Sequence, residues 1–350
     1  MKAAIIHPFV VVFCLVAALN LYGQTAMPEP NWDRSLALRT IHKDDTQATL
    51  KPLFQMARAG SNQELLDALS AIVQDPEILA PAKDYTVFSF TLGLSDLDVN
   101  SVSPKVLDFL SAYEAQTLVA HDDHPRMTVP LFNVRAAAAG VQNNWDRQLA
   151  ATRATSLLQE HPDQWVSSYL AASLAERRGF VDSLDSAPPA ALRELGWSAL
   201  AQLDEKPELT LVTASAAMNS GDFELLQQSI SQGNGPGLSR VLEDASRKLS
   251  TEESVELLEH SLQLGSDTKA ALAIAQLAPA LLDEPAVRKI LFGTLADRNL
   301  GAAAALVLGA SSNPEIQAQL IEIASKEGGL ARQRAEMAIS TGRANRGAEL

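Results

Sequence analysis

Apolar residues recur along most of this 350-residue chain at the three- and four-residue spacing of a helix face. Leu50, Leu53 and Ala57 mark one such face, and the same spacing returns in segment after segment. A second face follows Ser61, which together with Glu64 matches the capping box that opens many helices. Strand-like alternation is rare. The pattern therefore predicts an all-α fold.

Two segments are less regular than the rest. Residues 85–94 are rich in β-branched and aromatic residues but lack alternation and lie between helical patterns. We expect a buried helix there, with a strand as the alternative. Another helix is expected to end near Val119, just before a polar run.

Proline marks a recurrent helix start. In five places a polar residue precedes Pro, and a charged or small residue and then an aliphatic residue follow, at Pro76, Pro104, Pro207, Pro285 and Pro314. Proline suits the first helical position because its missing N–H has no partner there in any case. Pro104 comes 28 residues after Pro76, and Pro314 comes 29 residues after Pro285. Each interval accommodates two helices and two turns.

One of these starts continues into a family-like motif. Residues 284–291 read Glu-Pro-Ala-Val-Arg-Lys-Ile-Leu, which resembles the start of a helix in HEAT-type repeats. The runs 134–137 and 331–335, each with an arginine beside alanines, are weaker matches. The resemblance is clearest over residues 269–340 and is interrupted over 177–237.

This resemblance implies an α-solenoid of stacked antiparallel helix pairs that binds partner proteins on its concave face. It does not imply a reaction. Tetratricopeptide repeats also pair alanine-rich helices and are the second interpretation. Their 34-residue period with a Trp, Gly and Tyr signature is not visible in this sequence.

The N-terminus has the features of a secretory signal. Lys2 precedes an apolar stretch over residues 9–19, which is too short for a permanent membrane span. We expect cleavage after Gly23 or Ala26 and export to a bacterial periplasm or to the exterior. Cys14 follows Phe13, where a lipoprotein signal would carry a small residue, so we do not expect Cys14 to be acylated.

The mature chain then divides as follows. Residues 27–45 form a polar leader, residues 46–340 form the helical repeats, and residues 341–350 form a flexible tail. The Gly-Asn-Gly-Pro-Gly run at 233–237 is a candidate break within the repeats. No later stretch of 18 uncharged apolar residues occurs, so we expect no transmembrane segment in the mature chain.

Charge and cysteine content narrow the function classes. The chain has 42 acidic and 28 basic residues, a net charge of −14, which argues against nucleic-acid binding. Its one cysteine excludes an intramolecular disulfide framework and a cysteine-based zinc finger.

The densest group of potential metal ligands is the run His121, Asp122, Asp123 and His124. Two imidazoles with one or two carboxylates suit zinc or another divalent ion, so the chain could be an exported metal-dependent hydrolase. The alternative is a polar helix terminus with solvated side chains. A dedicated site would need a more distant ligand, and the remaining histidines of the mature chain are His42, His161 and His260.

Other chemistry finds little support in the sequence. It has no nucleophile elbow and no phosphate-binding glycine loop, so no cofactor is expected apart from a divalent ion at residues 121–124. Asn144 beside Trp145 could mark a carbohydrate groove in a ring of helices, but we expect Trp145 and Trp165 to pack in the core. The leading expectation is therefore an exported, non-catalytic scaffold with unidentified protein partners.

Overall fold

The computed structural model describes residues 29–348 except 42, 100 and 327. The described part is all-α, with 18 α-helices, four short 3-10 helices and a single two-stranded hairpin. The signal segment expected at residues 1–26 lies outside the described residues. Among the described helices, none combines the length and the apolar character that a membrane span requires.

The chain divides into two compact units, residues 1–146 and 147–350. The division falls within the 27-residue helix α7 (Val134–Glu160). Each unit has its own hydrophobic core and is described by itself.

The glycine-rich run at 233–237, expected as a candidate break, is a tight turn inside the second unit. The N–H of Asn234 donates to the Thr210 hydroxyl, 3.3 Å away. A Cβ on Gly233 would lie only 2.4 Å from the Ser229 carbonyl oxygen. The glycine therefore allows the chain to fold back closely on its own helix, which a flexible linker would not require.

The first unit packs helices around one apolar centre. Its elements are α2 (Arg34–Arg39), α3 (Lys43–Ala59), α4 (Asn62–Gln74), α5 (Ala80–Gly93), η1 (Leu94–Asp96), α6 (Pro104–Ser111), β1 (Leu118–Ala120), β2 (Thr128–Pro130) and the first part of α7. Residues 34–39 and 43–45 of the expected leader are thus helical.

Helix α5 confirms the expected helix at residues 85–94. Val87 and Phe90 are fully buried, and the helix also buries Thr86 and Thr91. The Thr86 and Thr91 hydroxyls each donate to the carbonyl four residues earlier, at 2.8 and 2.7 Å. These bonds satisfy polar groups that would otherwise be costly to bury.

The prediction of a helix that ends near Val119 was wrong, because residues 118–120 form strand β1. This strand pairs antiparallel with β2, with Val119 opposite Val129. The N–H groups of Gln116 and Thr117, just before this strand, donate to the buried carboxylate of Asp84, at 3.0 and 2.7 Å. A helix here would have to break these bonds.

The prediction of a helix start at Pro76 was also wrong. The Asp75 N–H closes α4 by donating to Ala71, and the Asp75 carboxylate accepts from the Glu77 N–H at 2.8 Å. These bonds make residues 75–79 a turn, and the next helix begins at Ala80. Helices do begin at Pro104, Pro285 and Pro314, while Pro207 opens a 3-10 turn.

The second unit continues from α7 with fifteen further elements. They are α8 (Pro162–Ala171), α9 (Leu174–Ser183), η2 (Leu184–Ser186), α10 (Pro189–Leu200), η3 (Pro207–Leu209), α11 (Thr210–Ser220), α12 (Phe223–Gln232), α13 (Pro236–Lys248), α14 (Thr251–Gln263), α15 (Asp267–Leu277), η4 (Ala278–Leu281), α16 (Pro285–Thr294), α17 (Gly301–Ala310), α18 (Pro314–Ser325) and α19 (Leu330–Ala348). Helix α19 thus covers residues 341–348 of the expected tail.

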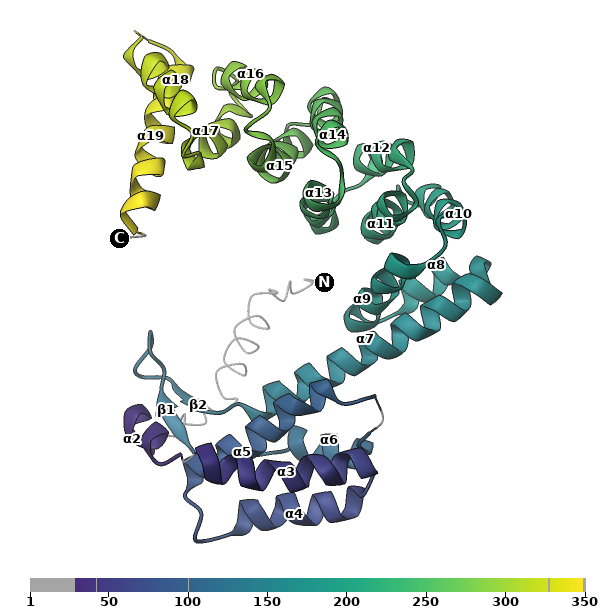
Figure 1. Cartoon of the computed structure of the whole chain (residues 1–350), viewed down its shortest axis with the longest axis vertical. Coiled ribbons are helices and arrows are strands. Elements are labelled where there is room, and N and C mark those ends of the chain that lie inside the picture. The colour runs from purple at the N-terminus through teal and green to yellow at the C-terminus, as the bar shows by residue number, and fades with distance from the viewer. Residues whose placement is uncertain (1–28, 42, 100, 327, 349–350) are drawn as a thin grey trace, which may run out of the picture. The chain divides into compact units, whose positions relative to one another are not determined.

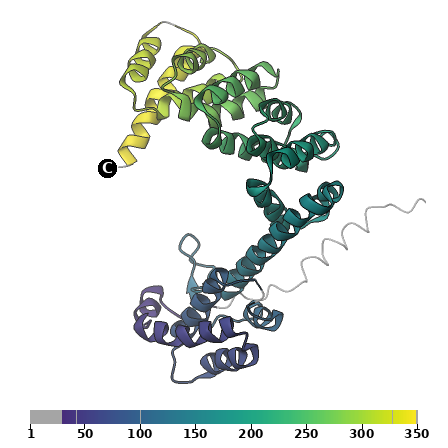
Figure 2. The same cartoon turned by 45° about the vertical axis from the view of Figure 1, so that its right-hand side comes forward.

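The helices of the second unit pack in the order of the chain. Helices α11, α13, α15 and α17 each contact the next odd-numbered helix, and α12 contacts α10 and α14. Within this unit, Figure 1 shows α11, α13, α15 and α17 along the inner side of a curve and α12, α14 and α16 along the outer side. The same order, from teal to yellow, can be followed in Figure 2. We call α11, α13, α15 and α17 the inner row.

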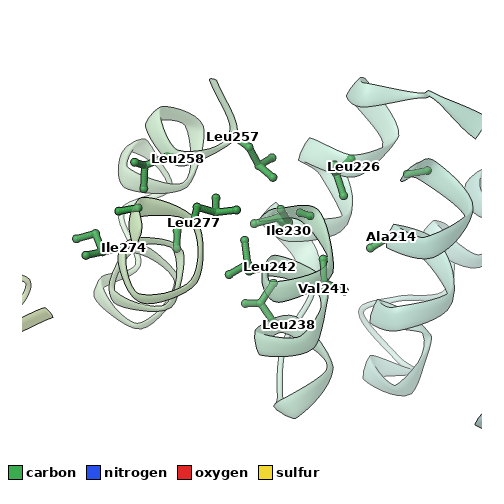
Figure 3. Packing of buried hydrophobic residues seen from close by; sticks show 14 of the residues in the cluster. Ala214, Leu226, Ile230, Leu238, Val241, Leu242, Leu257, Leu258, Ile274 and Leu277 are labelled. Carbon is green, nitrogen blue, oxygen red and sulfur yellow. The ribbon is translucent and has the colours of Figure 1, made fainter. Parts of the chain in front are cut away.

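One apolar core runs between the helices of this unit. Figure 3 shows Ile230 of α12, Leu242 of α13 and Leu277 of α15 in the same packed layer. All three side chains are fully buried. Close contact at the end of the unit depends on small residues, since a Cβ on Gly309 of α17 would lie 2.5 Å from the Ala338 carbonyl oxygen of α19.

Four arginines close the ends of preceding helices or turns, and we call them the capping arginines. They are Arg135, Arg177, Arg288 and Arg334. Each donates to backbone carbonyls just before its own helix or at the end of an earlier one: Tyr113 for Arg135, Leu170 for Arg177, Leu282 for Arg288 and Leu295 for Arg334.

Candidate functional site

The run His121, Asp122, Asp123 and His124 lies in the connection between β1 and β2, not on a helix. The two imidazole rings stack with centroids 5.4 Å apart. His121 Nδ1 accepts a hydrogen bond from the Asp123 N–H at 3.1 Å. Asp122 forms an ion pair with Arg34 at 3.2 Å. Local partners thus already engage one imidazole nitrogen and one carboxylate.

No group of three or more His, Cys, Asp or Glu side chains among the described residues is arranged to hold a metal ion. Of the more distant histidines, His42 lies outside the described residues, and His161 and His260 belong to the second unit. The metal site at 121–124 stays a prediction. Metal analysis of the purified protein beside a His121→Ala/His124→Ala variant tests it, because stoichiometric zinc or manganese lost in the variant would establish the site.

The expectation for the tryptophans is confirmed, since Trp145 is 4% exposed and Trp165 is fully buried. Trp165 packs edge-on against Phe180 and stacks with Tyr169. Because the Trp145 ring lies in the core of the first unit, it does not line an open groove. A carbohydrate site centred on Trp145 is therefore excluded.

The second unit contains a serine–histidine pair that the sequence does not reveal. Ser231 Oγ lies 2.9 Å from His260 Nε2 and donates its proton to the Gln227 carbonyl at 2.8 Å. Lys269 donates to the Ser231 carbonyl, and burial lowers the pKa of Lys269. The cluster therefore ties α12, α14 and α15 together.

A pocket of about 400 Å³ lies in the second unit, and we call it the arginine pocket. It lies at the first turns of α9, η3–α11 and α13. Its lining residues are Tyr169, Leu174, Arg177, Arg178, Val181, Pro207, Glu208, Leu211, Asn234, Gly235, Pro236, Gly237 and Arg240. The volume is within the range of small binding pockets in proteins.

The local sequence explains how these helix starts come together. Pro207 and Pro236 lie at equivalent positions 29 residues apart, and each begins a helical segment. Gly235 has φ 74°, a left-handed conformation that glycine adopts without strain, and it turns the chain into α13. The Tyr169 hydroxyl donates to the Glu208 carbonyl at 3.1 Å, which holds η3 against α8. Burial raises the pKa of Tyr169, so its hydroxyl keeps its proton.

The surface of the arginine pocket is mainly apolar. Leu174, Val181 and Leu211 supply aliphatic side chains, and the two prolines add ring surface. Leu174 is the first residue of α9, and its apolar side chain is 72% exposed. An apolar surface of this kind can take an aliphatic group from a ligand.

The three arginines of the pocket differ in what they contact. Arg177 is engaged with the carbonyls of the α8 C-terminus, and its guanidinium lies 5.4 Å from the Tyr169 ring centroid. Arg178 is exposed and has no hydrogen-bond or ion-pair partner within the described part of the chain. Arg240 has a loose ion pair with Asp244 at 3.9 Å. Two guanidinium groups are thus available to an anion.

Of the described residues that line the arginine pocket, Glu208 alone is acidic, and none is a histidine, cysteine or serine. The pocket therefore has the means to bind an anionic, partly apolar group. Sequence reasoning missed it because its residues come from three separated segments. The 29-residue spacing of Pro207 and Pro236 was the available signal.

A second pocket, of about 510 Å³, lies in the first unit and includes Arg39, Asp45 and Glu77. Its charges are mixed, and its remaining lining is threonine and aliphatic side chains. This arrangement does not select one ligand charge.

Comparisons with protein-family models, with curated proteins and with solved structures find no match to this chain.

Proposed function

We propose that this chain is an exported, non-catalytic helical-repeat protein of the HEAT-like type that binds other proteins. The observation that carries the proposal is the packing order of the second unit. Its main helix–helix contacts join α-helices no more than two apart in chain order. Repeat proteins have this property, because each repeat contacts its neighbours and the stack completes the core.

The capping arginines support the repeat interpretation. Arg177 and Arg288 each lie at the fourth residue of a helix, in α9 and α16, and each donates to carbonyls that immediately precede the helix. The same arginine–carbonyl interaction thus recurs at two distant points of the unit. Its recurrence fits a chain built from related helix pairs.

Binding, in preference to catalysis, is supported by the chemistry of the second unit. The arginine pocket is formed by the starts of α9, α11 and α13, whose last two helices belong to the inner row. Stacked helix pairs can vary the side chains of such a surface without disturbing the core. Export is supported by the signal-like N-terminus and by a mature chain without cysteine, which suits an oxidising compartment.

Site-specific photo-crosslinking in the native cell tests the binding proposal. A photoreactive phenylalanine analogue at Leu174 should give a discrete adduct with another protein. The matched control is Ile321 of α18, which is 57% exposed and lies outside the arginine pocket. Equal adduct patterns at both positions, or no adduct at Leu174, would contradict the proposal.

Export is tested separately by intact mass. A chain recovered from the periplasm or medium should begin at Gln24 or Met27, as expected for cleavage after Gly23 or Ala26. An uncut chain confined to the cytoplasm would contradict export while leaving the binding proposal open to its own test.

A further inference from the structure

The arginine pocket combines two features that one ligand has to match. Its lining includes the aliphatic side chains of Leu174, Val181 and Leu211 and the guanidinium groups of Arg178 and Arg240. In a chain of net charge −14, two weakly engaged arginines beside an apolar surface are a local reversal of charge. The complementary group is a carboxylate next to an aliphatic chain.

The surface continues beyond the pocket along α13. A polar depression of about 340 Å³ shares Pro236 and Arg240 with the arginine pocket and adds Ser239, Glu243, Asp244 and Arg247. Arg247 pairs with Glu243 and Asp244 at 2.9 and 2.6 Å, so this part presents charges of both signs. A ligand that occupies both parts needs an aliphatic group followed by a polar chain.

We infer that the arginine pocket binds an extended segment of a partner protein in which an aliphatic residue is followed by an acidic residue. This inference rests on the proposed function, because it names the chemistry of the partner. The aliphatic side chain packs against Leu174, Val181 and Leu211, and the acidic side chain contacts Arg178 and Arg240. The polar residues beyond it lie along the depression on α13.

A peptide has advantages over a small amphiphilic acid as the occupant. The pocket is open to solvent and continues into a polar surface, whereas a fatty acid requires apolar contact along its whole tail. Backbone amides and hydroxyls of a peptide can use the mixed charges of Glu243, Asp244 and Arg247.

The test is a ligand-observed NMR titration of the full-length protein with the hexapeptide Gly-Ser-Leu-Glu-Ser-Gly, acetylated and amidated at its ends. We expect saturable binding. Replacing its Glu by Gln, or its Leu by Ser, should weaken binding about tenfold, the effect expected for one charge-assisted hydrogen bond or one buried aliphatic group.

Protein variants locate the site. Arg178→Gln/Arg240→Gln should weaken binding of the hexapeptide about tenfold or more, and Glu208→Gln should leave it equal or tighter. The matched control is Arg298→Gln, an exposed arginine outside the arginine pocket, which should not change binding. Since Arg178 is exposed and unpaired, circular dichroism should show that the double variant folds normally.

Three outcomes would overturn the inference: absence of saturable binding, equal binding of the Gln-containing peptide, or tighter binding of octanoate that displaces the peptide. The crosslinking at Leu174 separates this failure from failure of the proposed function. An adduct without peptide binding would reject the aliphatic–acidic segment and keep the scaffold. Peptide binding without an adduct would contradict the scaffold, and the inference would then hold only for the chemistry that the pocket recognises.

Discussion

Two adjacent arginines of α9 have different surroundings. Arg177 donates to three carbonyls at the end of α8, whereas Arg178 is exposed without a partner in the described structure. Lysine cannot reproduce the planar fork of Arg177. Arg177→Lys should lower the free energy of unfolding by about 1–2 kcal/mol. Arg178→Lys, the matched control, should change it by less than about 0.5 kcal/mol in urea unfolding. Equal effects would mean that the capping bonds do not stabilise the unit.

Two helical glycines form a second matched pair. A Cβ on Gly179 of α9 would lie 2.0 Å from the Arg147 carbonyl oxygen of α7, while a Cβ on Gly140 meets nothing within 4 Å. Gly179→Ala must therefore push two backbones apart and should cost about 1–3 kcal/mol. Gly140→Ala should stabilise by about 0.5–1 kcal/mol, because alanine is the better helix former. Thermal unfolding of both variants measures this, and a stable Gly179→Ala protein would show that α7 and α9 are packed less closely.

At the scale of elements, two helices of the second unit begin with capping boxes. Ser173 and Glu176 open α9, and Ser250 and Glu253 open α14, with both reciprocal bonds formed in each. Hydrogen bonds from the backbone and side chain of Ser173 lower the pKa of Glu176. Bonds from the side chain and backbone of Ser250 lower the pKa of Glu253. The folded state thus favours the ionised form of both carboxyl groups over the protonated form.

A lowered carboxyl pKa makes stability depend on pH in one direction. The stabilisation is present above the pKa of the unfolded chain, near about 4.3, and is lost as pH falls through the lower folded value. Urea unfolding between about pH 5 and pH 3 should therefore show decreasing stability. The variant Glu176→Gln/Glu253→Gln keeps a capping residue but has no charge to titrate, so its decrease should be smaller. Identical slopes would show that other carboxyl groups dominate.

Much of the element structure could be predicted from local pattern. The amphipathic spacing and the proline starts located α3, α16 and α18 because these signals act within one or two turns. The hairpin at residues 118–130 could not be predicted in this way, because Asp84, about 30 residues earlier, holds its first strand in place. Ser61 does occupy the N-cap of α4, but without the side-chain bond that its sequence indicates.

The candidate site was beyond sequence reasoning for a related physical reason. The run at 121–124 drew attention because its chemistry is contiguous, yet a binding surface is assembled in space. Arg178, Glu208 and Arg240 are each unremarkable as surface residues in the sequence. Only the packing of α9, η3 and α13 brings them to one pocket.

At the scale of the whole molecule, the helices of the second unit pack against their neighbours in the chain. A core substitution there should therefore destabilise only the helices around it. Leu291 of α16 is fully buried, and Leu291→Ala should cost about 2–5 kcal/mol. Hydrogen exchange followed by mass spectrometry should show faster exchange in α15, α16 and α17, with α8 to α11 unchanged. The control Leu306→Ala removes an exposed leucine of α17 and should change exchange little. Uniformly faster exchange across the unit would indicate one cooperative globular domain and would contradict the repeat interpretation.

The packing order also sets how the second unit would carry a mechanical load. Because its main contacts join helices close in chain order, a pulling force applied at its two ends passes through each helix–helix interface in series. The weakest interface would then yield first and extend the unit while the rest stays folded. The second unit would then lengthen one interface at a time under force and regain its folded length when the force is removed.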